Sequence, residues 1–128
     1  MPALVVTLIG PDRPGLVGAV SDVVRQHGGN WLESRMSHLA GQFAGIILVD
    51  AADSDIDALA TGLQSLKDHG LKVITEVDAA AKTSPGTDPI WQLDVVGNDR
   101  PGIVREVTQV LATRSVNVEE LTTECTDA

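Results

Sequence analysis

A long phrase occurs twice in this chain, and the repetition limits the possible folds more than any other feature. Residues 10–17 read Gly-Pro-Asp-Arg-Pro-Gly-Leu-Val, and residues 97–104 read Gly-Asn-Asp-Arg-Pro-Gly-Ile-Val. The copies lie 87 positions apart, and this spacing also relates the pairs Val20 and Val107, Asn30 and Asn117, and Glu33 and Glu120. A repeat that covers so much of a 128-residue chain predicts one structural unit used twice.

Composition and charge exclude several broad classes of protein. Hydrophobic residues make up 43% of the chain, which permits a packed core, and the net charge is −9. An acidic chain without a Lys/Arg-rich run repels phosphates, so direct binding to nucleic acid is not expected. No signal sequence and no apolar run near roughly 20 residues is present, so we expect no membrane insertion and a cytoplasmic location. Cys125 is the only cysteine, which fits a reducing compartment.

Residues 1–78 predict a complete α+β unit of order βαββαβ, the ferredoxin-like arrangement. Asp12 is expected to cap the first helix, with Pro14 in its first turn. The unbroken run Ile46–Val49 predicts a strand that is buried on both faces. Val20 and Leu63 are expected between helix and sheet. The strands are expected at 3–10, 30–39 (an edge strand), 43–49 and 71–77, in the spatial order 4-1-3-2.

The remaining residues predict a linker and an incomplete second unit. Residues 79–89 are small, polar and rich in Pro and Gly, which is typical of a linker. Residues 90–128 then repeat only the first half, with a strand at 90–96, a helix at 101–114 and a strand at 117–126. The second copy is therefore expected to be truncated after β-α-β. Its last strand needs a partner from later residues or from another chain, because unpaired backbone groups are costly when buried.

The predicted sheet is covered by helices on one face only. Val5, Ile9, Ile47 and Val49 nevertheless place apolar side chains on both faces of the central strands. An exposed apolar patch of this kind usually meets a partner. We therefore expect the two copies to pack together, or a homodimer, or both.

The repeated loop has the chemistry of a small-anion site. Each copy joins a strand to a helix N-terminus, where free N–H groups carry partial positive charge. Gly15 and Gly102 have no Cβ, so a carboxylate can approach the backbone closely. Asn30 and Asn117 begin the next strand, on the far side of the helix from the loop, and offer both a donor and an acceptor, which suits an α-amino acid. The same residues also make a sound helix entry and turn, so a purely structural role stays open.

Other polar residues do not form a recognisable catalytic or metal site. His27, His38 and His69 are scattered without ligand spacing, so we expect no metal and no cofactor. His27 is expected at the C-terminus of the first helix, where a cation is favourable, with Arg114 in the same place in the second copy. Glu33 and Arg35, on one strand face, are expected to form a solvated pair. No nucleophile, base and orienting group occur together, so the protein is not expected to be an enzyme.

A βαββαβ unit with Asp-Arg-Pro-Gly after its first strand and Asn at the start of its second resembles the ACT domain, a family of regulatory modules that bind amino acids. Two such units in tandem, with the segments at 30–36 and 41–49, resemble the transcriptional repressors within that family. The resemblance implies a non-enzymatic regulator that senses glycine or a similar small amino acid. Such a regulator would act on transcription through a protein partner, a DNA-binding activator.

The resemblance also implies which residues contact the ligand. These are Asp12, Arg13, Pro14, Gly15, Leu16 and Asn30 in the first copy, and Asp99, Arg100, Pro101, Gly102, Ile103 and Asn117 in the second. Two alternatives remain. In the first, the chain is the regulatory part of an enzyme such as formyltetrahydrofolate deformylase, which begins with a similar ACT domain. In the second, it is a purely structural dimerisation module.

Overall fold

The computed structural model describes residues 2–78, 89–97 and 101–124, which belong to two compact units. The first unit comprises residues 1–85 and the second residues 86–128. The predicted linker, apart from Pro89, lies outside the described residues, as do Asp99, Arg100 and Cys125. In the part of the chain that is described, no helix is long and apolar enough to cross a membrane.

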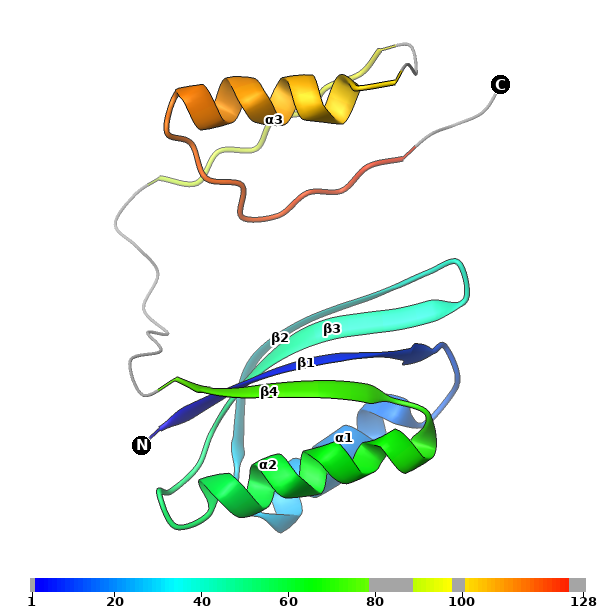
Figure 1. Cartoon of the computed structure of the whole chain (residues 1–128), viewed down its shortest axis with the longest axis vertical. Coiled ribbons are helices and arrows are strands. Elements are labelled where there is room, and N and C mark those ends of the chain that lie inside the picture. Colours follow the sequence, from blue (N-terminus) through cyan, green and yellow to red (C-terminus); the bar gives the residue numbers. More distant parts are fainter. Residues whose placement is uncertain (1, 79–88, 98–100, 125–128) are drawn as a thin grey trace. The chain divides into compact units, whose positions relative to one another are not determined.

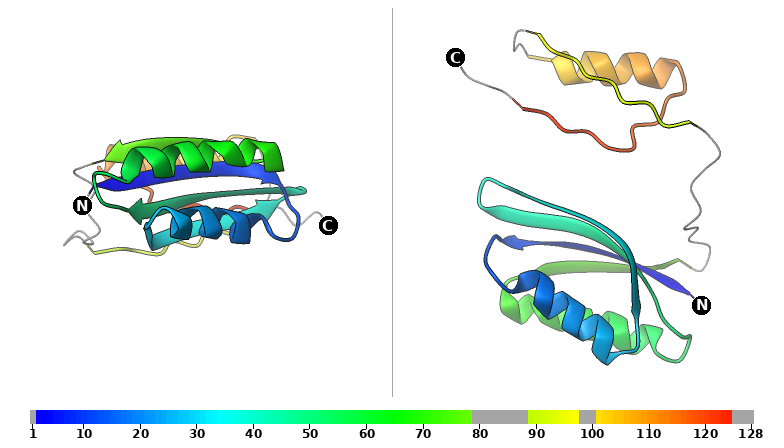
Figure 2. Two further views of the ribbon diagram at one scale, coloured as in Figure 1. Left: turned by 90° about the horizontal axis from the view of Figure 1, so that it is seen from below. Right: turned by 180° about the vertical axis from the view of Figure 1, so that it is seen from behind.

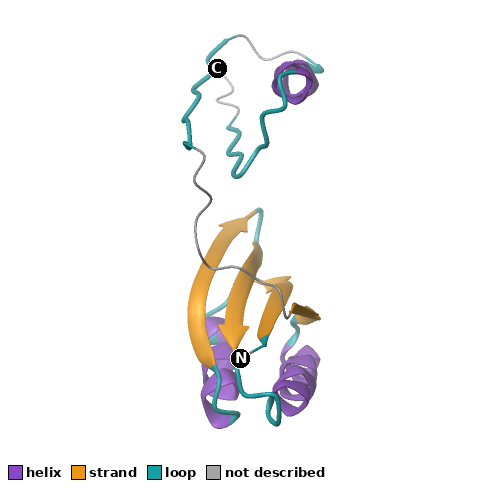
Figure 3. Ribbon diagram, turned by 90° about the vertical axis from the view of Figure 1, so that its left-hand side faces the viewer, coloured by secondary structure: helices purple, strands orange, loops and turns teal. Residues whose placement is uncertain are grey.

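The first unit is a four-stranded antiparallel sheet with two helices on one face (Figures 1 and 3). The strands lie in the order β2-β3-β1-β4, which confirms the predicted ferredoxin-like arrangement and the edge position of β2. Its elements are β1 (Ala3–Pro11), α1 (Leu16–Gln26), β2 (Asn30–Leu39), β3 (Gln42–Asp50), α2 (Ile56–Gln64), a 3-10 helix η1 (Ser65–His69) and β4 (Lys72–Asp78).

The core lies between the two helices and the sheet. Each helix turns one apolar stripe inward, because its apolar residues recur at helical spacing. Val20 of α1 is 1% exposed and Leu63 of α2 is 0% exposed, which confirms the prediction for both. The other core residues come from β1, β3, the helices and the residues just after β3 and η1: Leu4, Val6, Leu8, Leu16, Val24, Ile47, Val49, Ala51, Ile56, Leu59, Leu66 and Leu71.

The prediction that the run Ile46–Val49 is buried on both faces is wrong for this unit. Ile47 and Val49 point to the helices and are buried, whereas Ile46 is 56% exposed on the other face. Successive side chains of a strand alternate between faces, and both helices of this unit pack on the face that carries Ile47 and Val49. Ile9 and Ile74 are exposed on that open face as well.

The entry to α1 also differs from the prediction. Asp12 and Pro14 precede the helix, and Gly15 is the N-cap, with a left-handed backbone at φ 91°. The Asp12 N–H donates instead to the carbonyl of Gly41 in the β2–β3 turn, at 3.0 Å. Asp12 therefore secures the loop to the hairpin, and the glycine makes the turn into the helix because a residue without Cβ adopts a positive φ freely.

The second unit contains the predicted helix but not the predicted strands. α3 spans Ile103–Thr113. The predicted strands at 90–96 and 117–126 are not formed in their described residues, which are irregular, and Trp91 and Val96 are 84% and 95% exposed. A strand is stable only when its backbone groups find partners. None of the described residues pairs with these two segments.

Candidate functional site

The candidate site is the loop between β1 and α1. Gly15 caps α1 without help from any side chain, and the first helical bond runs from the Ala19 N–H to the Gly15 carbonyl at 3.0 Å. The first amides of the helix therefore have no intrahelical partner. A Cβ placed on Gly15 would meet nothing within 4 Å. The loop thus presents partially positive amides to open space, a setting in which helix N-termini bind carboxylates and phosphates.

The second copy reproduces this helix entry. Gly102 is the N-cap of α3 at φ 85°, and the Glu106 N–H donates to its carbonyl at 3.0 Å. A Cβ on Gly102 would also meet nothing within 4 Å. Of the predicted contacts in this copy, Pro101, Gly102, Ile103 and Asn117 lie within the described residues.

Two contacts secure the first loop to distant parts of the same unit. Asp12 Oδ2 lies 3.5 Å from His38 Nδ1 near the end of β2. On the other side, the Arg13 guanidinium donates through Nη2 to the backbone carbonyl of His69, at the end of η1. Figure 2 (right) shows the β1–α1 loop, in blue, at the same end of the sheet as the β2–β3 turn. Neither histidine is recognisable from the sequence as part of this site, because nothing near it in the chain links it to the loop.

Asn30 does not lie beside this loop. The sheet register aligns Asn30 with Asp50 and Asp50 with Ala3, whereas Pro11 is aligned with Gln42 at the opposite end. α1, with 11 residues, separates the two ends by roughly 16 Å. Within one unit, therefore, Asn30 and the loop cannot contact the same small ligand. If both contact one ligand, the asparagine belongs to a neighbouring domain.

Both asparagines are paired with carboxylates. Asn30 Nδ2 donates to Asp50 Oδ1 at 3.0 Å, and Asn117 Nδ2 donates to Glu119 Oε1 at 3.0 Å. Each pairing leaves the asparagine carbonyl oxygen available as an acceptor. An acceptor beside a carboxylate is suited to an ammonium group.

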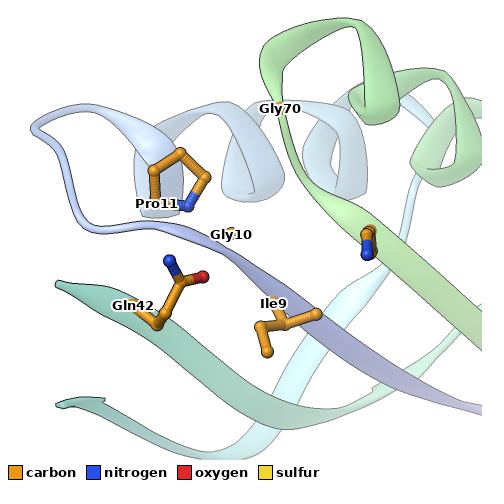
Figure 4. Close-up of a pocket in the computed structure, with 6 residues that line it drawn as sticks. Ile9, Gly10, Pro11, Gln42 and Gly70 are labelled. Carbon is orange, nitrogen blue, oxygen red and sulfur yellow. The ribbon is translucent and has the colours of Figure 1, made fainter. Parts of the chain in front are cut away.

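A small pocket of about 150 Å³ lies beside the loop, where β1 ends (Figure 4). Its walls come from β1, β3, the turn before β4 and the first residue of β4. They are formed by Ile9, Gly10, Pro11, Gln42, Gly70 and Lys72. The lining includes an apolar side chain, two glycines and a lysine, but neither Gly15 nor Leu16, so the pocket is separate from the amides of the helix entry.

The remaining candidate residues have structural roles. His27 is the C-cap of α1, with Nδ1 2.9 Å from the Val23 carbonyl, and Arg114 is the C-cap of α3, as predicted. Glu33 Oε1 lies 3.7 Å from Arg35 Nη2, and both side chains are mostly exposed, which confirms a solvated pair. Across residues 2–78, 89–97 and 101–124, no group of three or more His, Cys, Asp or Glu side chains is placed to hold a metal ion.

Fold and loop together define a regulatory type of domain. The family model of the ACT domain matches residues 3–77, and the chain belongs to the ACT domain family. It is similar to the glycine cleavage system transcriptional repressor of Escherichia coli, with 29% identity over 121 residues that cover 92% of this chain. The chain spans 62% of that relative's length.

Solved structures agree with this assignment. An unknown protein from Galdieria sulphuraria superimposes with a TM-score of 0.76 and 32% identity, covering 96% of this chain and 70% of its own. A candidate glycine cleavage system transcriptional repressor superimposes with a TM-score of 0.66 and 26% identity, covering 89% of this chain and 67% of its own. The chain that carries the repeated phrase and the segments at 30–36 and 41–49 is thus similar to proteins described as glycine cleavage system transcriptional repressors.

Proposed function

We propose that this chain is a non-enzymatic regulatory protein that binds a small amino acid, glycine or a similar one, and acts on transcription through a protein partner. The observation that carries the proposal is the open helix entry at Gly15, which occurs in the same form at Gly102. The similarity to the repressor of E. coli supports glycine as the first candidate ligand.

In this proposal, the ligand's carboxylate accepts hydrogen bonds from the amides of Gly15 and Leu16. These amides lie at the positive end of α1, which favours an anion. The ligand's ammonium group is held by an Asn30 from a neighbouring domain, in a homodimer or a second unit, together with the Asp50 carboxylate paired with it. The site is therefore completed only when two ACT domains meet.

The effect on transcription is proposed to be indirect. The net charge of −9 disfavours contact with DNA phosphates, and a DNA-binding protein partner would supply that contact. The open face of the sheet, with Ile9, Ile46 and Ile74 exposed, is apolar enough to join a second domain.

Titration calorimetry on the full chain with glycine, serine and alanine tests the ligand. We expect binding of at least one of them at millimolar concentration or better, and loss of binding with methylamine, which lacks the carboxylate. Gly15→Asn is the informative variant, because Asn tolerates the left-handed backbone better than other residues and places a side chain over the amides. It should weaken binding by roughly tenfold or more.

Gly41→Asn is the matched control. Gly41 also has a positive φ, 77°, and a Cβ there also meets nothing within 4 Å, but it lies in the β2–β3 turn and not at a helix entry. It should bind the ligand as the parent does. If no amino acid binds to the parent, or if Gly15→Asn binds as tightly as Gly41→Asn, the loop is only a helix entry and the proposal fails.

A further inference from the structure

The Arg13 side chain turns away from the helix entry that it precedes. Its guanidinium donates to the His69 carbonyl, and Nη2 lies 3.5 Å from the position that a Cβ on Gly70 would take. At Gly15, in contrast, no side-chain atom of Arg13 comes within 4 Å of the corresponding position. The positive charge nearest in sequence to the amides is therefore directed to another element of the fold.

The segment that receives Arg13 is the end of a long helical stretch. α2 continues directly into η1, and the Gly70 and Leu71 N–H groups bond back to Lys67 and Leu66 at 3.0 and 3.4 Å. Within the described residues, no backbone N–H donates to the His69 carbonyl. A free carbonyl at the C-terminal end of a helix carries partial negative charge, so it attracts a guanidinium.

The loop is held on its other side by the hairpin. The Asp12 N–H donates to the Gly41 carbonyl at 3.0 Å, and the Asp12 carboxylate lies 3.5 Å from His38 Nδ1. Asp12 and Arg13 thus connect adjacent positions of the loop to opposite sides of the sheet end. A short segment fixed at two neighbouring residues has few backbone conformations left, so the direction of the following amides is set before any ligand arrives.

We infer that Arg13 is a positioning residue: it fixes the β1–α1 loop through the His69 carbonyl, and so orients the Gly15 and Leu16 amides, without itself contacting the ligand. The predicted effect of Arg13 on ligand binding rests on the proposed function. The structural part of the inference, the orientation of the loop, stands on the contacts of Arg13 alone and is measurable without ligand.

The first experiment compares ligand-free proteins by NMR. In Arg13→Gln, the amide signals of Gly15 and Leu16 should shift and their NMR order parameters should fall from about 0.85 toward about 0.6, because the loop loses one of its two fixed points. Arg13→Lys retains a positive charge that reaches the carbonyl and should restore the parent signals in part. Arg25→Gln is the control, since Arg25 is exposed on α1 and only pairs with Asp22 at 3.8 Å, and it should leave both amides unchanged.

Calorimetry with glycine then separates the two roles. A positioning residue predicts weaker binding in Arg13→Gln together with altered ligand-free amides. Weaker binding with unaltered ligand-free amides would mean that Arg13 contacts the ligand. Unaltered binding with unaltered amides would mean that the contact between Arg13 and the His69 carbonyl does not orient the loop. Either result overturns the inference. If the amides respond but the parent binds no amino acid, the orientation of the loop by Arg13 stands and the proposed function fails.

Discussion

α1 and α3 have the same local structure in different surroundings. Both helices have 11 residues and a left-handed glycine as N-cap. At their C-termini, the amides of Gly28 and Gly29 donate to carbonyls of the last turn of α1, and the amides of Ser115 and Val116 do the same in α3, all at 2.9 to 3.1 Å. These paired bonds form the Schellman type of helix end. The repeated sequence therefore specifies both ends of the helix twice.

The two helices differ in what covers their apolar stripe. In α1, Leu16, Val20 and Val24 are buried against the sheet, whereas α3 has no buried residue although Val107 occupies the position of Val20. Caps are made by neighbours in the sequence, but burial needs a sheet, and the first unit owes its sheet to strands from both halves of the unit. The comparison separates what a short phrase determines from what the complete unit determines.

The largest expected difference between the two copies is the one between Val20→Ala and Val107→Ala. Val20→Ala should lower the free energy of unfolding of the first unit by roughly 2 kcal/mol, because it removes buried methyl groups and leaves a cavity. Val107→Ala should leave that unit unchanged. Urea unfolding followed by tryptophan fluorescence measures both, in a Trp91→Phe background that leaves Trp31, which packs against the core, as the reporter.

Leu63→Ala serves as the positive control for this measurement. Leu63 is fully buried, and its replacement should cost roughly 3 kcal/mol. If Val107→Ala destabilises the first unit as much as Val20→Ala does, the two copies share one core and the contrast between α1 and α3 is lost.

A second prediction concerns the left-handed residue at the helix C-terminus, which differs between the copies. The left-handed position after the helix is Gly28 in the first copy, at φ 70°, and Ser115 in the second, at φ 57°. A residue with a Cβ pays roughly 1 kcal/mol there. Gly28→Ser should therefore destabilise the first unit by about 1 kcal/mol, and Ser115→Gly should slow hydrogen exchange in α3.

These two substitutions sharpen the comparison between α1 and α3, because they change the helix cap and leave the apolar stripe of each helix intact. A Cβ on Gly28 would meet only Asp55 Oδ2, at 3.6 Å, so steric crowding does not add to the cost. An unchanged stability in Gly28→Ser would show that packing in the first unit overrides the cap. Unchanged exchange in Ser115→Gly would show that the cap does not limit the stability of α3.

The predictions made from the sequence show the same division between what a short phrase determines and what the complete unit determines. The element order of the first unit and the C-cap positions of His27 and Arg114 were predictable, since Gly-Gly and helical periodicity are local signals. The βαββαβ order predicted that helices cover only one face of the sheet. The run Ile46–Val49 by itself did not, because four apolar residues in a row do not tell which face a helix covers.

The candidate site was only half predictable for the same reason. The glycine at the helix entry was recognisable from Asp-Arg-Pro-Gly. The position of Asn30 on the far side of α1 from the loop was recognisable as well, because the helix separates the two segments along the chain. The contact between Arg13 and the His69 carbonyl joins residues 56 positions apart, which is a consequence of the folded unit that spacing along the chain does not encode.

The smallest expected effect concerns the pair that connects the first loop to the hairpin. Asp12 Oδ2 and His38 Nδ1 lie 3.5 Å apart, and both side chains are substantially exposed. In the second copy the position of His38 is taken by Cys125, so Asp99 has no equivalent histidine at that position. Asp12→Asn should therefore lower the stability of its unit by at most about 0.5 kcal/mol, and Asp99→Asn should not affect that unit.

A charge interaction predicts a specific dependence on conditions. The loss in Asp12→Asn should shrink in about 1 M salt, which screens exposed charges. Urea unfolding of Asp12→Asn, His38→Gln and the double variant measures the coupling between the two residues, with Asp99→Asn as the matched control. If the double variant loses the sum of the two single losses, the pair contributes nothing, and the backbone bond from Asp12 to Gly41 alone holds this side of the loop.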